Sequence, residues 1–190
     1  MFKTSKFFMV VLVLILSAGS LWAITISVKL SGPGVVNDST IKVGKKVSFD
    51  IYIENDATFQ GFTMGFKFTS PDIKNIIHVP DSSGGLTKRG DIKGYNGWQD
   101  KSIWDLGGVY VSRIDWNGKL PELIGFGGFC VKKKYSPHKL AKNLSIGVEF
   151  NSPGTIKIDS SYFPPIGEWL FVPGKTRPIW KGPYSFKVIK

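Results

Sequence analysis

The sequence of 190 residues has very few of the side chains that build disulfides and metal sites. It contains one cysteine, Cys130, and two isolated histidines, His78 and His138. A lone cysteine excludes an internal disulfide. Paired-cysteine, HExxH and EF-hand patterns are missing as well, so we expect no metal site and no cofactor. Cys130 lies in an apolar stretch and is predicted to be buried, with pairing to another chain as the alternative.

Two kinds of chemistry stay open despite these absences. The first is a surface calcium ion between Asp81 and Asp105, held by oxygen atoms of residues that are separated in the sequence, because such sites need no compact motif. A glycoside hydrolase needs only two carboxylates about 5 to 10 Å apart, which a sequence does not reveal. No G-x-S-x-G nucleophile elbow occurs. The protein is therefore predicted not to be an enzyme, with a glycoside hydrolase as a minor alternative whose candidate carboxylates are Asp100, Asp105, Asp115, Glu122, Glu149 and Glu168.

The sequence also lacks the three-and-four spacing of apolar residues that marks amphipathic helices. After residue 23, apolar and polar side chains alternate in short segments, as in strands with one buried face. The 22 glycines and 11 prolines separate these segments. The predicted fold is all-β, an antiparallel β-sandwich, which we prefer to a closed barrel because the connections differ widely in length. The segments are 24–30, 47–53, 62–68, 109–116, 144–150, 156–158 and 184–188, with 169–172 as a short buried strand.

The first 23 residues have the layout of a secretory signal peptide. Two lysines precede the unbroken apolar run 7–16, and small residues follow it. We expect this signal helix to be cut after Ala23, with a cut after Ser20 or an uncut membrane anchor as alternatives. Residues 24–190 then form a single domain in the cell envelope or outside the cell, with no stable membrane span.

Acidic residues are outnumbered, since 25 lysines and arginines face 14 aspartates and glutamates, a net charge of +11. Such a balance favours polyanions, either acidic polysaccharides or anionic lipids. Export makes nucleic acid the least suitable of these partners. The densest basic run is Lys132, Lys133 and Lys134, which we place at the tip of a hairpin. It is either a solvated tip or a contact with an anionic surface.

Aromatic residues, by contrast, are abundant at 14% of the chain. The long Gly-rich connection 80–105 carries Tyr95, Trp98 and Trp104, whose flat rings are of the kind that stack on sugars. Long loops in compact domains are often functional. These three residues are the candidate ligand-binding site of a carbohydrate-binding module. The structural alternative is that tryptophans cap the ends of the core, which applies to Trp104, Trp116 and Trp169.

Two stretches resemble a known family. In residues 31–68, Val-Gly precedes one alternating strand, Asn-Asp ends it, and Gly-Phe opens the next. This order resembles the N-terminal half of cohesin-like domains, which are jelly-roll β-sandwiches of secreted bacterial proteins related in fold to a group of carbohydrate-binding modules. Residues 163–188 are similar to the end of such domains. The turn Thr69–Asp72 departs from the Tyr-Asp-Pro-like turn of the family.

The resemblance implies a non-catalytic recognition or scaffold module. Cohesins present a sheet face to a helical protein partner, so an extracellular protein is the expected partner, with a polysaccharide as the alternative. The resemblance does not assign that face to individual residues of this sequence.

Overall fold

The computed structural model describes residues 23–56, 58–79, 108–129, 138–161, 169–173 and 177–190. Within these ranges every regular element is a β-strand. No helix of the described part is long and apolar enough to cross a membrane. The predicted signal segment up to residue 22 and Cys130 lie outside the described residues, as does the whole segment from Asp81 to Asp105 proposed for calcium.

The strands form two sheets. Sheet A has the order β12-β1-β4-β9-β6, and sheet B has the order β2-β3-β13-β10-β5-β8-β7, with β11 also paired with β5. The strands of sheet A are β1 (Ile24–Ser31), β4 (Lys46–Asn55), β6 (Ile77–His78), β9 (His138–Glu149) and β12 (Ile179–Trp180). Those of sheet B are β2 (Val35–Asn37), β3 (Thr40–Lys42), β5 (Gly61–Thr69), β7 (Gly108–Asp115), β8 (Glu122–Phe129), β10 (Gly154–Ser160), β11 (Leu170–Val172) and β13 (Tyr184–Ile189).

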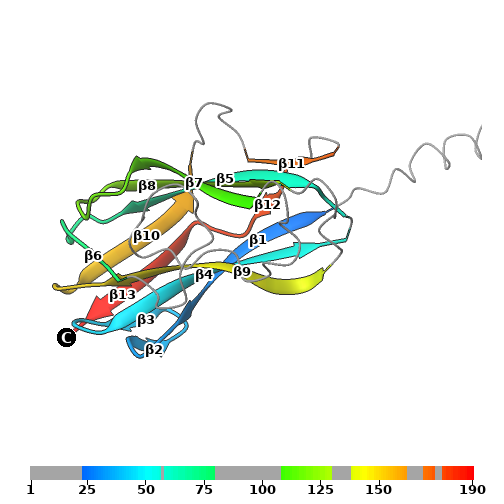
Figure 1. Ribbon diagram of the computed structural model, residues 1–190. Helices are drawn as coiled ribbons and strands as arrows, with labels where there is room; N and C mark the ends of the chain where they lie inside the picture. The colour runs from blue at the N-terminus through cyan, green and yellow to red at the C-terminus, as the bar shows by residue number, and fades with distance from the viewer. Residues whose placement is uncertain (1–22, 57, 80–107, 130–137, 162–168, 174–176) are drawn as a thin grey trace, which may run out of the picture.

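The two sheets pack face to face, which confirms the predicted β-sandwich (Figure 1). The alternating apolar residues of β1, β4, β5, β10 and β13 point between the sheets, where burial removes them from water. Phe49 on β4 lies at the centre of this contact. Its ring centroid is 5.6 Å from that of Phe68 on β5 and 5.5 Å from that of Phe186 on β13. The core is therefore continuous from sheet A to sheet B.

The sheets are mixed, so the prediction of a purely antiparallel sandwich was wrong in this detail. β1 pairs with β12 in parallel, and β3 pairs with β13 in parallel. Alternation along one strand reports which face is buried but carries no information about the direction of its neighbour. The strands β2, β3 and β12 were not predicted, because two or three residues are too few to show an alternation.

The predicted hairpin around Lys132–Lys134 was also wrong. β8 belongs to sheet B and pairs with β5 and β7, whereas β9 belongs to sheet A and pairs with β4 and β6. The connection between β8 and β9 therefore crosses from one sheet to the other. A local sequence pattern locates two strands but does not show that they pair.

Candidate binding surfaces

Both groups of predicted site residues lie outside the described residues. These are the aromatic group Tyr95, Trp98 and Trp104 and the basic group Lys132, Lys133 and Lys134. Their roles stay predictions.

Two tryptophans expected to cap the core are described, and both are buried: Trp116 is 5% exposed and Trp169 is 9% exposed. Each contacts a core phenylalanine edge to face, Trp116 with Phe68 and Trp169 with Phe66.

The outer face of sheet B carries exposed lysines on four adjacent strands. On β10 the buried Ile156 and Ile158 point inward, so Lys157 between them points outward. The same alternation applies on the other three strands. The only carboxylate at an outward position of these four strands is Asp159. We call this surface the basic face; its lysines are Lys42 on β3, Lys67 on β5, Lys157 on β10 and Lys187 on β13.

Sheet A carries charges of both signs on its outer face. Among the side chains that the structure describes, Lys29 and Lys46 lie at outward positions together with Glu54 and Glu149. Lys29 on β1 lies with its ammonium 5.0 Å from the ring centroid of Tyr52 on β4. Asp50 on β4 is buried and accepts a hydrogen bond from the Ser145 hydroxyl.

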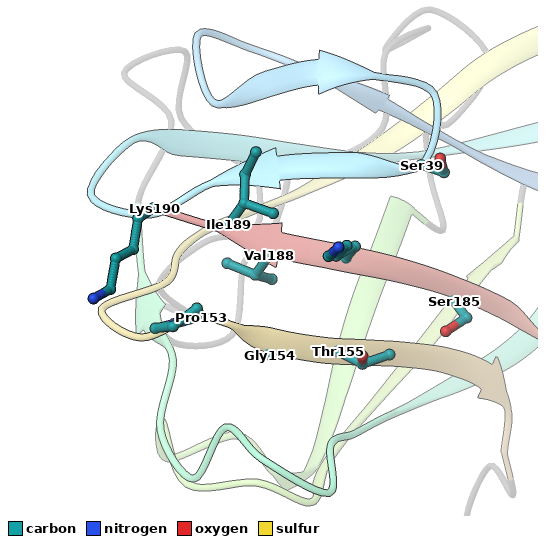
Figure 2. Close-up of a pocket in the computed structure, with 9 residues that line it drawn as sticks. Ser39, Pro153, Gly154, Thr155, Ser185, Val188, Ile189 and Lys190 are labelled. Atoms are coloured by element: carbon teal, nitrogen blue, oxygen red, sulfur yellow. The ribbon is translucent and has the colours of Figure 1, made fainter.

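An open groove of about 690 Å³ crosses one end of the basic face, along β10, β13 and the turn between β2 and β3 (Figure 2). Hydroxyl side chains from all three elements line it, namely Ser39, Thr155 and Ser185. The ammonium groups come from Lys187 and Lys190. Among its described lining residues there is no carboxylate side chain. The volume lies within the range of about 300 to 1,000 Å³ that is usual for ligand sites.

The groove rests on a rigid backbone. Thr155 on β10 and Lys187 on β13 are directly paired across the two strands. The backbone N–H of Lys187 donates to the carbonyl of Ser39 over 2.8 Å, which ties the turn to β13. Gly154 opens β10 where a side chain does not fit, because an added Cβ would lie 2.8 Å from Ile73 Cγ1 and 2.9 Å from Asp72 Cβ. Its φ of 155° also disfavours other residues.

Asp159 is half-buried and already engaged. Its carboxylate accepts the indole N–H of Trp180 over 3.1 Å and lies 3.2 Å from the Lys157 ammonium. Partial burial alone raises the pKa of Asp159, but the hydrogen bonds from Lys157, from the backbone N–H of Ser160 and from Trp180 outweigh it and hold that pKa below its usual value. Asp159 therefore stays ionised and neutralises only one of the lysines of the basic face.

The Trp180 ring is held against the backbone of Gly182. An added Cβ at Gly182 would lie 2.4 Å from Cζ2 of Trp180, so only glycine allows this close approach. The ring also packs edge to face against Phe66, Trp169 and Tyr184. These contacts place the indole N–H toward Asp159.

A second polar cluster joins the two sheets at another edge. The Glu122 carboxylate on β8 is fully buried and accepts hydrogen bonds from the Gly118 backbone N–H and from His78 Nε2, the latter over 2.8 Å. The His78 ring stacks on Trp116, with 4.3 Å between centroids and 9° between planes. The carboxylate thus links β8 to β6 and to the segment just before β8, which indicates a structural role. Sequence analysis considered both residues but did not bring them together.

The remaining described hydrolase candidates do not converge on Glu122. Asp115 accepts a hydrogen bond from the side chain of Asn117 over 2.7 Å. Glu149 lies on β9 in sheet A, opposite Lys46, whereas Glu122 lies in sheet B. Asp100, Asp105 and Glu168 lie outside the described residues. Among the described residues, no three His, Cys, Asp or Glu side chains are grouped to hold a metal ion.

No protein-family model matches the sequence, and no curated protein matches it. The fold, however, matches solved cohesin modules. A type II cohesin domain from the cellulosome of Acetivibrio cellulolyticus aligns with a TM-score of 0.55 over 85% of this chain and 95% of its own, at 14% identity. A cohesin module from a family 33 glycoside hydrolase of Clostridium perfringens aligns with a TM-score of 0.50 over 88% of this chain and 97% of its own, at 9% identity.

A type III cohesin module from a cell-surface anchoring scaffoldin of Ruminococcus flavefaciens gives a similar result. It aligns with a TM-score of 0.50 over 87% of each chain, at 10% identity. The resemblance to cohesins suggested by residues 31–68 and 163–188 is thus confirmed for the fold. At such low identity the likeness establishes the architecture, and the function has to be argued from the residues of this chain.

Proposed function

We propose that this protein is an exported, non-catalytic recognition module that binds a protein partner on the basic face. The observation that carries the proposal is a cohesin-type sandwich in which the outer face of one sheet carries exposed lysines on four adjacent strands. A flat sheet face offers a broad contact surface without a deep pocket, which suits a protein more than a small molecule. Of the described hydrolase candidates, Asp115 and Glu122 are engaged in internal hydrogen bonds, and Glu149 lies on the other sheet from both, which favours a non-catalytic role.

The charge of the basic face identifies the kind of partner. Lys67 and Lys157 are exposed, and Asp159 offsets one positive charge. Complementary charge steers association and excludes partners of like charge. We therefore expect the partner to present an acidic surface. The outer face of sheet A, where lysines and carboxylates are mixed, is the natural internal control.

The test uses the full exported chain and its envelope proteins. The partner is captured, identified, purified and cross-linked to the chain, and the cross-links are mapped by mass spectrometry. We expect them on β5 and β10. Lys67→Glu should weaken binding of the purified partner by at least about tenfold, because it replaces an attractive contact with a repulsive one. Lys29→Glu makes the same charge change on sheet A and should leave the affinity unchanged.

Two results would contradict the proposal. One is a set of cross-links confined to sheet A. The other is equal affinity of the parent and the Lys67→Glu variant for the purified partner. Circular dichroism and thermal unfolding of both variants ensure that a loss of binding reflects the surface and not the fold.

A further inference from the structure

We propose that the groove at the end of the basic face is a binding site for an acidic polysaccharide. The groove shares Lys187 with the basic face, but the inference does not depend on the protein partner proposed above, because it needs neither Lys67 nor Lys157. It rests on the side chains that three different elements bring together around β13 (Figure 2).

The groove combines the two polar functions that an acidic sugar chain requires. Exposed ammonium groups of Lys187 and Lys190 supply positive charge for carboxylate or sulfate groups. The hydroxyls of Ser39, Thr155 and Ser185 both donate and accept hydrogen bonds, as sugar hydroxyls do. A bare phosphate or carboxylate ion would use the ammonium groups but would leave the spread of hydroxyls without a role.

The apolar part of the lining fits the same ligand. Pro153 and Ile189 contribute aliphatic surface beside these polar groups. A sugar ring presents C–H groups on its faces and hydroxyls at its rim, so it contacts aliphatic and hydroxyl side chains at once. The groove is open, which lets a polymer pass through it.

Preorganisation favours binding at this position. The backbone hydrogen bonds from Lys187 to Ser39 and from Val43 to Ile189, both 2.8 Å long, connect β13 to the turn before β3 and to the residue that follows β3. The direct pairing of Thr155 with Lys187 fixes a hydroxyl beside an ammonium stem. The backbone of the groove therefore needs little ordering when a ligand binds, which lowers the entropic cost.

The test measures binding of the full chain to two acidic polymers and their neutral counterparts by isothermal titration calorimetry. The pairs are polygalacturonate with its fully methyl-esterified form, and dextran sulfate with dextran. We expect binding to at least one acidic polymer, no binding to its neutral counterpart, and weaker binding at higher salt. Lys187→Gln should reduce the affinity by about tenfold, the loss typical of a hydrogen bond to a charged group.

Two further variants separate a built site from general charge attraction. The double variant Thr155→Val with Ser185→Ala removes two hydroxyls without changing charge, and we expect it to weaken binding several-fold. Lys29→Gln on sheet A is the matched charge control and should bind like the parent. Lys67→Glu, which tests the protein partner, leaves all groove residues in place, so failure of one proposal is distinguishable from failure of the other.

The proposal is overturned if neither acidic polymer binds, or if Lys29→Gln weakens binding as much as Lys187→Gln. An unchanged affinity in the hydroxyl double variant would also overturn it, because only charge would then matter. Tighter binding of poly-L-glutamate or of phosphatidylglycerol vesicles at the same residues would assign the groove to an acidic peptide or to a lipid surface instead.

Discussion

The indole N–H of Trp180 donates a hydrogen bond to the carboxylate of Asp159, and this bond joins the edge of sheet A to sheet B. β12 and β10 belong to different sheets, and the two residues are 21 positions apart. The bond therefore links the layers through a polar contact beside the continuous apolar core.

Removal of the indole donor should weaken the link between the sheets. Trp180→Phe keeps an aromatic ring but deletes the N–H group, and we expect a loss of about 1 kcal/mol in the free energy of unfolding, since Asp159 is partly exposed. Urea denaturation at pH 7 measures this loss. A double-mutant cycle with Asp159→Ala separates the hydrogen bond from the lost ring volume. A coupling energy of zero would show that the contact contributes nothing.

The same contact should make stability depend on pH on the acid side. The pKa of Asp159 is lowered in the folded protein from its reference value of 3.8. A carboxyl group with a lowered folded pKa contributes stability above its unfolded pKa, and the contribution is lost as the pH falls through the folded pKa. The stability difference between the parent and Trp180→Phe should thus be complete at pH 7 and shrink below about pH 4. A difference that grows on acidification would contradict this assignment.

Gly182 should be intolerant of any side chain. A Cβ there would lie 2.4 Å from Cζ2 and 2.7 Å from Nε1 of Trp180, so the ring would have to move. We expect Gly182→Ala to destabilise the fold by about 1 to 3 kcal/mol, as overpacking usually does. In a Trp180→Ala background the same change should cost much less, because the clashing ring is gone. Equal losses in both backgrounds, measured by thermal unfolding, would rule out this explanation.

His78 should contribute through two separable contacts. His78→Phe retains stacking on Trp116 but leaves the buried Glu122 carboxylate with one donor fewer, which should cost about 1 to 3 kcal/mol. His78→Ala should lose about 0.5 to 1.5 kcal/mol more, because stacking is lost as well. Chemical denaturation of the two variants tests the order. A His78→Phe variant as stable as the parent would show that the hydrogen bond is dispensable.

The exported protein should begin at Ile24. β1 starts at this residue, and Ile24 is buried at 4% exposure, so a cut after Ala23 leaves the first strand whole. The intact mass of the secreted protein measures the new N-terminus. Ala23→Phe places a large residue at the cleavage position and should shift the cut away from Ile24. A native N-terminus at Leu21 or Met1 would favour the cut after Ser20 or the uncut anchor.

Much of the architecture was predictable from local patterns. Phe62, Met64, Phe66 and Phe68 alternate along one segment, and all four are buried on the inner face of β5. The short apolar run 169–172 was expected to be a buried strand, and it contains β11 with the fully buried Phe171. These predictions succeed because the side chains of a strand alternate between two faces whatever strand lies beside it.

The binding surfaces were much less predictable. The groove combines the turn at Ser39, the start of β10 and the strand β13. More than one hundred residues separate the turn from the two strands along the chain. The His78–Glu122 pair is separated by 44 positions. No periodic pattern links such positions, because their proximity depends on the order and direction of strands in the sheets. In a sequence, isolated lysines and serines at alternating positions of a strand are typical of an ordinary solvated face.

The sequence by itself determined which residues enter the core, that the described part of the chain is all-β, and that it resembles cohesin-like domains. Those properties follow from local alternation and short motifs. Only the tertiary structure decided that β3 and β13 run in parallel, that β8 and β9 lie in different sheets, and that lysines from four strands share one face. Strand pairing depends on contacts between distant segments, and their free energies are not encoded in the pattern of any single strand.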